Sequence, residues 1–200
     1  MASRTQTSVV GTSLAVGTDR ASRSGIWVGI FAISMSFAAF TSALFVRQAS
    51  GDGVHIVLPP VIYANTIALL LSSIAMEMSR RSNVRGLGTE RREWSRSTGW
   101  LVVTLALGLA FVAGQCLAWR NLAAQGLYLA TNSNSSFFYV FTAMHGLHLL
   151  GGMAALVYLI GRRVDSRGTL RQSLADATAI YWHFMGVLWL YLLLVIGTRL

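Results

Sequence analysis

Residues 137–160 read FFYVFTAMHGLHLLGGMAALVYLI, an apolar run that contains no Asp, Glu, Lys or Arg. A helix needs about 20 such residues to cross a hydrocarbon layer roughly 30 Å thick. Four further runs of this kind occur, at residues 25–46, about 57–76, 98–119 and about 177–198. None of them alternates polar with apolar residues, so a membrane β-barrel is excluded. The sequence therefore predicts an all-α, polytopic transmembrane bundle of five helical spans.

The composition also indicates a fold that faces lipid. Hydrophobic residues make up 54% of the chain and charged residues only 12%, against about 25% in a typical soluble domain. The mean hydropathy is +0.56. So few charges cannot cover a soluble surface, which excludes a soluble enzyme, a zinc-finger protein and a disordered tail. The single cysteine, Cys116, allows no disulfide within the chain and is expected to be an inert small hydrophobe.

The basic residues predict the orientation of the chain. All sixteen are arginines, and thirteen lie before the first run or in the second and fourth loops. By the positive-inside rule, the N-terminus is inside and the C-terminus outside. Residues 1–24 are expected to form a flexible cytoplasmic tail, and residues 25–200 a single membrane domain. The arginines lie in short clusters without interleaved aromatic residues, so no nucleic-acid partner is predicted.

Three histidines lie inside the predicted spans. His145 and His148 are three residues apart, so they share one face of the fourth helix, and His183 lies in the fifth. One interpretation is metal or haem ligation, although two histidines on one helix cannot clamp a haem axially. The other is that these imidazoles hydrogen-bond across helix interfaces.

The second span ends at a charged group. Glu77 is followed by Arg80 and Arg81, at the spacing favoured by helical ion pairs. Glu77 is interpreted either as an entry point for protons or as an interfacial carboxylate paired with these arginines. Two further sets of residues predict close packing between helices. One is a polar stripe in the second span, formed by Asn65, Thr66, Ser72 and Ser73. The other is a set of glycines in the last two spans: Gly146, Gly151, Gly152 and Gly186.

Three segments resemble one protein family. Residues 135–152 (SSFFYVFTAMHGLHLLGG) are similar to the helix of haem–copper oxidase subunit III that carries an HGLH motif. Residues 181–196 (YWHFMGVLWLYLLLVI, with Trp182) resemble that family's last helix. Residues 65–81 (NTIALLLSSIAMEMSRR) resemble its helix with a terminal Glu. The likeness covers about residues 25–200 and fits the short, five-helix bacterial form of cytochrome c oxidase subunit III.

The resemblance implies a function without a catalytic centre, metal or cofactor in this chain. Subunit III packs on subunit I, which holds the haems and copper, within a complex that also contains subunit II. It is expected to support proton uptake, bind phospholipid and protect the active site during oxygen reduction in the bacterial inner membrane. By analogy, the structural, lipid-contacting or proton-entry candidates are His145, His148, His183, Glu77, Trp182, Arg80 and Arg81.

The sequence departs from the family pattern at two positions. Many members carry a buried Glu in the helix equivalent to the first span, where this chain has Ile33. Many also carry Asp two residues after YWHF, where this chain has Gly186. The electron donor stays open between cytochrome c and a quinol. Two alternatives of other classes are a membrane cytochrome b-like haem anchor and a small transporter.

Overall fold

The computed structural model describes the backbone of residues 3–49, 60–85, 91–126, 133–164 and 172–199. Within these ranges the only regular elements are five helices. They are α1 (Ser3–Gln48), α2 (Val61–Arg85), α3 (Arg91–Ala124), α4 (Ser133–Val164) and α5 (Gln172–Arg199). Each is long and apolar enough to cross a membrane. The predicted all-helical, five-span fold is therefore confirmed, while the inside–outside orientation stays a prediction.

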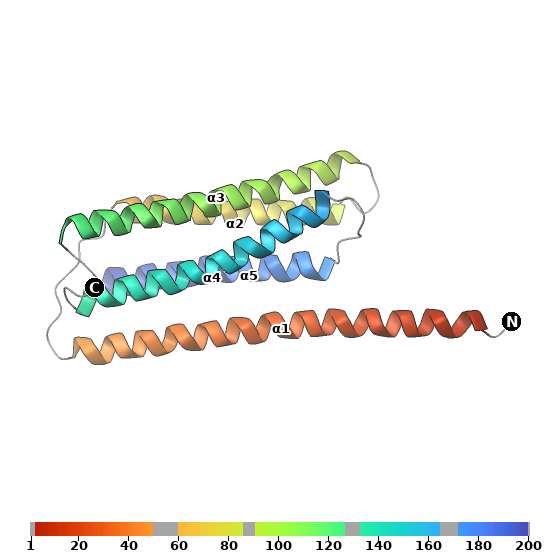
Figure 1. Cartoon of the computed structure of the whole chain (residues 1–200), viewed down its shortest axis with the longest axis horizontal. Coiled ribbons are helices and arrows are strands. Elements are labelled where there is room, and N and C mark those ends of the chain that lie inside the picture. The colour runs from red at the N-terminus through yellow and green to blue at the C-terminus, as the bar shows by residue number, and fades with distance from the viewer. Residues whose placement is uncertain (1–2, 50–59, 86–90, 127–132, 165–171, 200) are drawn as a thin grey trace.

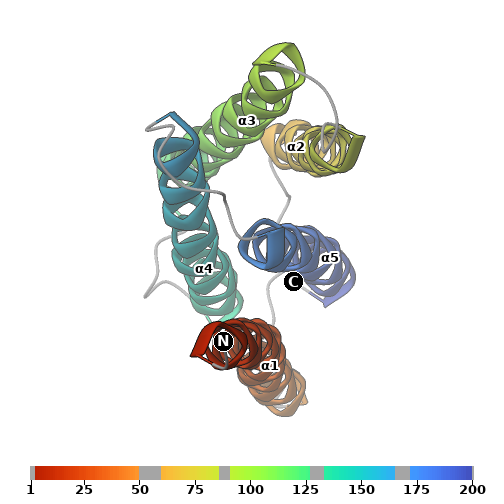
Figure 2. The same cartoon turned by 90° about the vertical axis from the view of Figure 1, so that its right-hand side faces the viewer.

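The helices pack side by side with their axes roughly parallel or antiparallel (Figure 1). In the end-on view, α2 and α3 form one side of the bundle, α4 and α5 lie in the middle, and α1 covers the opposite side (Figure 2). The contacts agree, because α1 touches only α4 and α5, while α5 also touches α2. The start of α1 and the end of α5 lie at opposite ends of the bundle, as an odd number of spans requires.

Two helix boundaries differ from the expected ones. Helix α1 begins at Ser3, so its backbone continues back through most of the segment for which we expect a flexible tail. The part of α1 able to span a membrane is Ser24–Gln48, close to the predicted span. Helix α2 begins at Val61, directly after Pro60, whose carbonyl accepts the first hydrogen bonds; Pro59 lies outside the described residues.

The core gathers on α5. Half of its spanning segment is buried within the chain, against 22% for that of α1. Trp182 and Trp189 are the largest fully buried side chains, packed among Phe111 of α3 and Leu149 of α4. Large apolar side chains, by contrast, cover the outside of the bundle, as a surface in contact with lipid or with another membrane subunit requires. They include Trp27, Phe31, Leu147, Val187 and Leu194.

Candidate functional site

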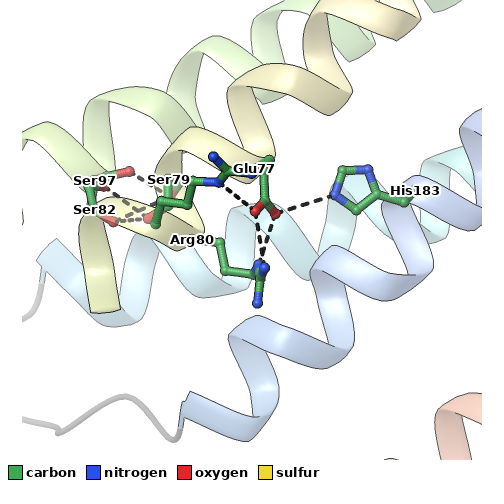
Figure 3. A network of polar contacts seen from close by, with 7 residues as sticks. Glu77, Ser79, Arg80, Ser82, Ser97 and His183 are labelled. Atoms are coloured by element: carbon green, nitrogen blue, oxygen red, sulfur yellow. Dashed lines mark hydrogen bonds and ion pairs between the residues drawn. The ribbon is translucent and has the colours of Figure 1, made fainter. Parts of the chain in front are cut away.

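A charged cluster lies in the C-terminal half of α2, beside the middle of α5. Both Arg80 and Arg81 bond the Glu77 carboxylate: Arg80 Nε donates to Oε2 at 2.9 Å and its Nη2 to Oε1 at 3.0 Å, while Arg81 Nε donates to Oε1 at 2.8 Å. From α5, Nε2 of His183 lies 3.9 Å from Oε2 of Glu77 (Figure 3). The predicted ion pair is present, and it lies within the spanning segment Val61–Ser82 of α2, which continues to Arg85.

The charges of this cluster balance in number. One carboxylate is shared by two guanidinium groups, whose side chains are 45% and 69% exposed. Asp176 of α5 adds a nearby negative charge that acts on Arg80. The exposed guanidinium groups can still pair with an anion at the outer side of the cluster, while one carboxylate is held at its centre.

Hydroxyl groups fasten α2 to α3 beside this cluster. Ser79 Oγ donates to the carbonyl of Ser97 at 2.9 Å, and Ser97 Oγ donates back to the carbonyl of Ser79 at 3.1 Å. Ser82 Oγ also donates to the Ser79 carbonyl, at 2.9 Å (Figure 3). The end of α2 that presents Glu77 is thus held rigidly against its neighbour.

His145 lies in the centre of the bundle, enclosed by aromatic rings. Its ring centroid is 5.2 Å from that of Trp189 and 5.9 Å from that of Phe111. Trp189 follows His183 by six residues on α5, a rise of about 9 Å along the helix. His145 and His183 are therefore at different levels and are not placed to clamp one haem between α4 and α5.

The imidazole of His148 bonds within its own helix. Nδ1 lies 2.6 Å from the carbonyl oxygen of Met144, and the Tyr181 hydroxyl donates to the backbone carbonyl of His148 at 2.9 Å. The expectation that the histidines hydrogen-bond across helix interfaces is therefore wrong for His148. Its ring nitrogen finds an acceptor one turn back on α4, while Tyr181 supplies the interhelical bond.

Aromatic donors on α5 bond hydroxyl groups of the helices around it. Nε1 of Trp182 donates to Ser72 Oγ and Nε1 of Trp189 to Thr66 Oγ1, both at 3.0 Å. The Tyr191 hydroxyl donates to Oγ1 of Thr41 on α1 at 2.9 Å. Each accepting hydroxyl in turn donates to a carbonyl of its own helix. The polar stripe of α2 therefore serves helix packing, as its spacing predicts.

The glycines divide into close-packed and open positions. A Cβ on Gly152 would lie 3.1 Å from Tyr181 and 3.4 Å from Trp182. One on Gly186 would lie 3.2 Å from Ser73 Oγ, so Ser73 is the polar neighbour at the position where many family members carry Asp. A Cβ on Gly146 would meet nothing within 4 Å, and one on Gly151 would only reach the Tyr181 hydroxyl at 4.0 Å. Close approach is thus confirmed for two of the four predicted glycines.

Sequence reasoning did not single out Gln115, whose side chain is buried in the structure. Its signal was a lone amide inside the apolar run FVAGQCLA of the third span. The neighbouring Cys116 is exposed. Ile33, at the position of the family's Glu, is a partly buried apolar residue packed against the core.

Over the described ranges, His, Cys, Asp and Glu side chains nowhere gather in threes at a spacing that could hold a metal ion. Glu77 and His183 form a pair of such groups, 3.9 Å apart.

Comparisons with known proteins identify the family. The family model of cytochrome c oxidase subunit III matches residues 10–198. The chain is 33% identical over 172 residues to a probable cytochrome c oxidase subunit 3 of Mycobacterium leprae, covering 81% of this chain and 80% of that one. It is 35% identical over 136 residues to that of Mycobacterium bovis, covering 66% and 62%. It is 26% identical over 178 residues to a cytochrome bo(3) ubiquinol oxidase subunit 3 of Pseudomonas aeruginosa, covering 86% and 82%.

These matches agree with the five spans and with the three motif-bearing helices, which lie in the order that the resemblance requires. A multi-pass membrane protein of this kind works within a complex with other oxidase subunits. The chain belongs to the cytochrome c oxidase subunit III family of the haem–copper oxidases.

Proposed function

We propose that this chain is the cofactor-free third subunit of a respiratory haem–copper terminal oxidase in the bacterial inner membrane. In this function it packs on subunit I, which holds the haems and copper, and contacts subunit II and other subunits of the complex. The observation that carries the proposal is the combination of an aromatic, hydroxyl-bonded core with a charged cluster between α2 and α5. The first suits a rigid support, and the second suits a surface that handles ions.

Proton uptake is the first role we assign to the charged cluster. Carboxyl and imidazole groups such as those of Glu77 and His183 can exchange protons with water, and these two lie 3.9 Å from one another on adjacent helices. A carboxylate beside an imidazole at a membrane surface can collect protons and pass them along the surface. We propose that these groups supply protons to an uptake path in subunit I.

Phospholipid binding is the second role. The exposed guanidinium groups of Arg80 and Arg81 lie on the same helix as an exposed apolar side chain, that of Met78. Arginine forms charge-assisted pairs with phosphate, and the apolar side chain suits an acyl chain. A lipid held here would stabilise the contact with subunit I and lengthen the working life of the oxygen-reducing site.

The electron donor of the complex is proposed to be cytochrome c. The names of the two mycobacterial relatives support this donor. The Pseudomonas aeruginosa relative, which is named a ubiquinol oxidase subunit, supports quinol as the second candidate. Purified complex assayed with reduced cytochrome c and with a quinol separates the two.

The function is tested by purifying the oxidase through a tag on subunit I, from cells with and without this chain. We expect the chain to co-purify, the iron and copper per subunit I to be equal in both preparations, and the preparation without the chain to lose activity sooner during turnover. Iron or copper stoichiometric with this chain would instead support a haem anchor. A chain that does not associate with subunit I would overturn the proposal.

A further inference from the structure

Three buried polar side chains lie at one level of the bundle, remote from the charged cluster. They are Asn65 of α2, Gln115 of α3 and His145 of α4, with relative exposures of 5%, 6% and 0%. None of them carries a formal charge when the imidazole is neutral. They come from three different helices, so their common level is a property of the fold and not of one sequence motif.

Contacts among their neighbours bring the three side chains to one level. The Asn65 amide lies against the backbone of Gly114, the residue before Gln115, because a Cβ on Gly114 would fall 1.9 Å from Asn65 Oδ1. Phe111, one turn before Gln115, has its ring 5.9 Å from that of His145.

Trp189 connects the same three helices from α5. Its ring lies 4.8 Å from that of Phe111 and 5.2 Å from that of His145. Its Nε1 donates to Thr66, the residue after Asn65. The polar groups therefore share one cross-section of the bundle, with Trp189 at its side.

Five polar atoms of this cluster have no hydrogen-bond partner in the part of the chain that the structure describes. They are Nδ2 of Asn65, Nε2 and Oε1 of Gln115, and Nδ1 and Nε2 of His145. Buried donors and acceptors are nearly always satisfied by protein or by ordered water. The set includes amide donors, a carbonyl acceptor and an imidazole, which carries one donor and one acceptor when neutral.

We propose that Asn65, Gln115 and His145 form an internal water site that holds one or more ordered water molecules between α2, α3 and α4. A water molecule both donates and accepts, so it can bond an amide N–H, an amide oxygen and an imidazole nitrogen at once. Neutral partners with no charged group among them do not suit an ion, whose burial needs an opposite charge.

A second tryptophan provides a built-in comparison. Trp182 is as fully buried as Trp189 and also donates to a hydroxyl on α2, namely Ser72. Its ring, however, lies against Gly108 and Gly152, where a Cβ would fall 3.0 Å and 3.4 Å from it. Trp189 is therefore next to the proposed water, and Trp182 is not.

The test is hydroxyl-radical footprinting of the intact oxidase complex by an X-ray pulse, read by mass spectrometry. X-rays generate hydroxyl radicals from water, and a buried side chain is oxidised only when water lies against it. We expect Trp189 and Phe111 to be oxidised several-fold faster than Trp182. Equal, background-level oxidation of both tryptophans would mean a dry site and would overturn the proposal.

Two variants of the same complex sharpen the test. Gln115→Met keeps the length of the side chain but removes its polar atoms, so oxidation of Trp189 should fall several-fold. Thr142→Val removes a hydroxyl that is already bonded to Trp119 on the same helix pair, so oxidation of Trp189 should not change. Unchanged oxidation in Gln115→Met would overturn the assignment of Gln115 as a ligand. If Gln115→Met does not assemble, the comparison of Trp189 with Trp182 in the unaltered complex still decides.

Discussion

The indole of Trp182 on α5 donates a 3.0 Å hydrogen bond to the hydroxyl of Ser72 on α2, and both side chains are completely buried. Ser72 accepts this hydrogen bond and donates another, from its Oγ to the carbonyl of Leu69 at 2.7 Å. Such a relay leaves no polar atom facing lipid while it joins two helices that are distant in sequence. In a membrane, where apolar burial does not distinguish helix contact from lipid contact, such bonds and close packing determine which helices associate.

Removing the acceptor of this relay should weaken the bundle. In Ser72→Ala the indole N–H of Trp182 loses its partner, and we expect the free energy of unfolding to fall by about 0.6 kcal/mol, the average for interhelical hydrogen bonds in a membrane protein, and by no more than about 1.7 kcal/mol, the maximum. Ser34→Ala is the matched control, because Ser34 is exposed and bonds only the Ile30 carbonyl of its own helix. Unfolding of the purified chain in mixed micelles measures both changes. A loss no greater than that of the control would show that the bond adds nothing to stability.

Gly114→Ala should be the most damaging of the small glycine substitutions. The new methyl group would fall 1.9 Å from Oδ1 of Asn65, so the buried amide must move. Overpacking of this kind typically costs about 1–3 kcal/mol. Gly146→Ala is the control, since a Cβ there meets nothing, and it should be neutral or slightly stabilising because alanine favours helix.

The cause of the Gly114 effect can be isolated with a second substitution. Asn65→Ala removes the side chain that the new methyl group strikes. Adding Gly114→Ala to Asn65→Ala should therefore cost much less than adding it to the unaltered chain. Equal costs in both backgrounds would place the clash elsewhere and contradict this explanation.

The spans could be predicted because each is a long uninterrupted apolar run, a signal that does not depend on tertiary contacts. The ends of the helices were harder to predict, since a helix can continue past its apolar run. The apolar run of the second span ends at Met76, whereas α2 continues to Arg85 and includes Glu77, Arg80 and Arg81. No local pattern in residues 3–23 signals the backward extension of α1.

Only part of the candidate site could be predicted from the sequence. Helical spacing alone predicts the Glu77 pairs, because all three residues are on α2. The approach of His183 to Glu77 depends on how α5 packs on α2, which no local pattern specifies. The level that Gln115 and His145 share with Asn65 has the same limitation, because it depends on how three helices pack.

The orientation of the chain can be tested by topology reporters. Thirteen arginines on one set of loops and termini against three on the other predict an inside N-terminus and an outside C-terminus. A reporter active only in the periplasm should therefore be active after Leu200 and inactive between Arg85 and Arg96. A C-terminus found in the cytoplasm would contradict the predicted orientation.

The last prediction concerns Glu77, the one carboxylate that both Arg80 and Arg81 bond. Glu77→Gln removes the charge and keeps the volume of the side chain. Ion pairs near a protein surface typically contribute about 0.2–1 kcal/mol, so the altered chain should still fold and assemble with subunit I. If Glu77 and His183 collect protons for the complex, oxygen reduction should continue but inactivation during sustained turnover should be faster. The difference should be greatest at alkaline pH, where protons are scarce.

Activity followed over many turnovers at neutral and alkaline pH measures this effect in the purified complex. Asp176→Asn is the matched control, because it removes a negative charge that also acts on Arg80 but leaves the Glu77 pairs intact. Faster inactivation of Glu77→Gln alone, and mainly at alkaline pH, would assign the effect to the carboxylate that lies beside His183. Equal acceleration in both variants would assign it to the net charge of this surface. Inactivation curves identical to those of the unaltered enzyme at both pH values would mean that Glu77 only forms ion pairs within α2 and takes no part in proton collection.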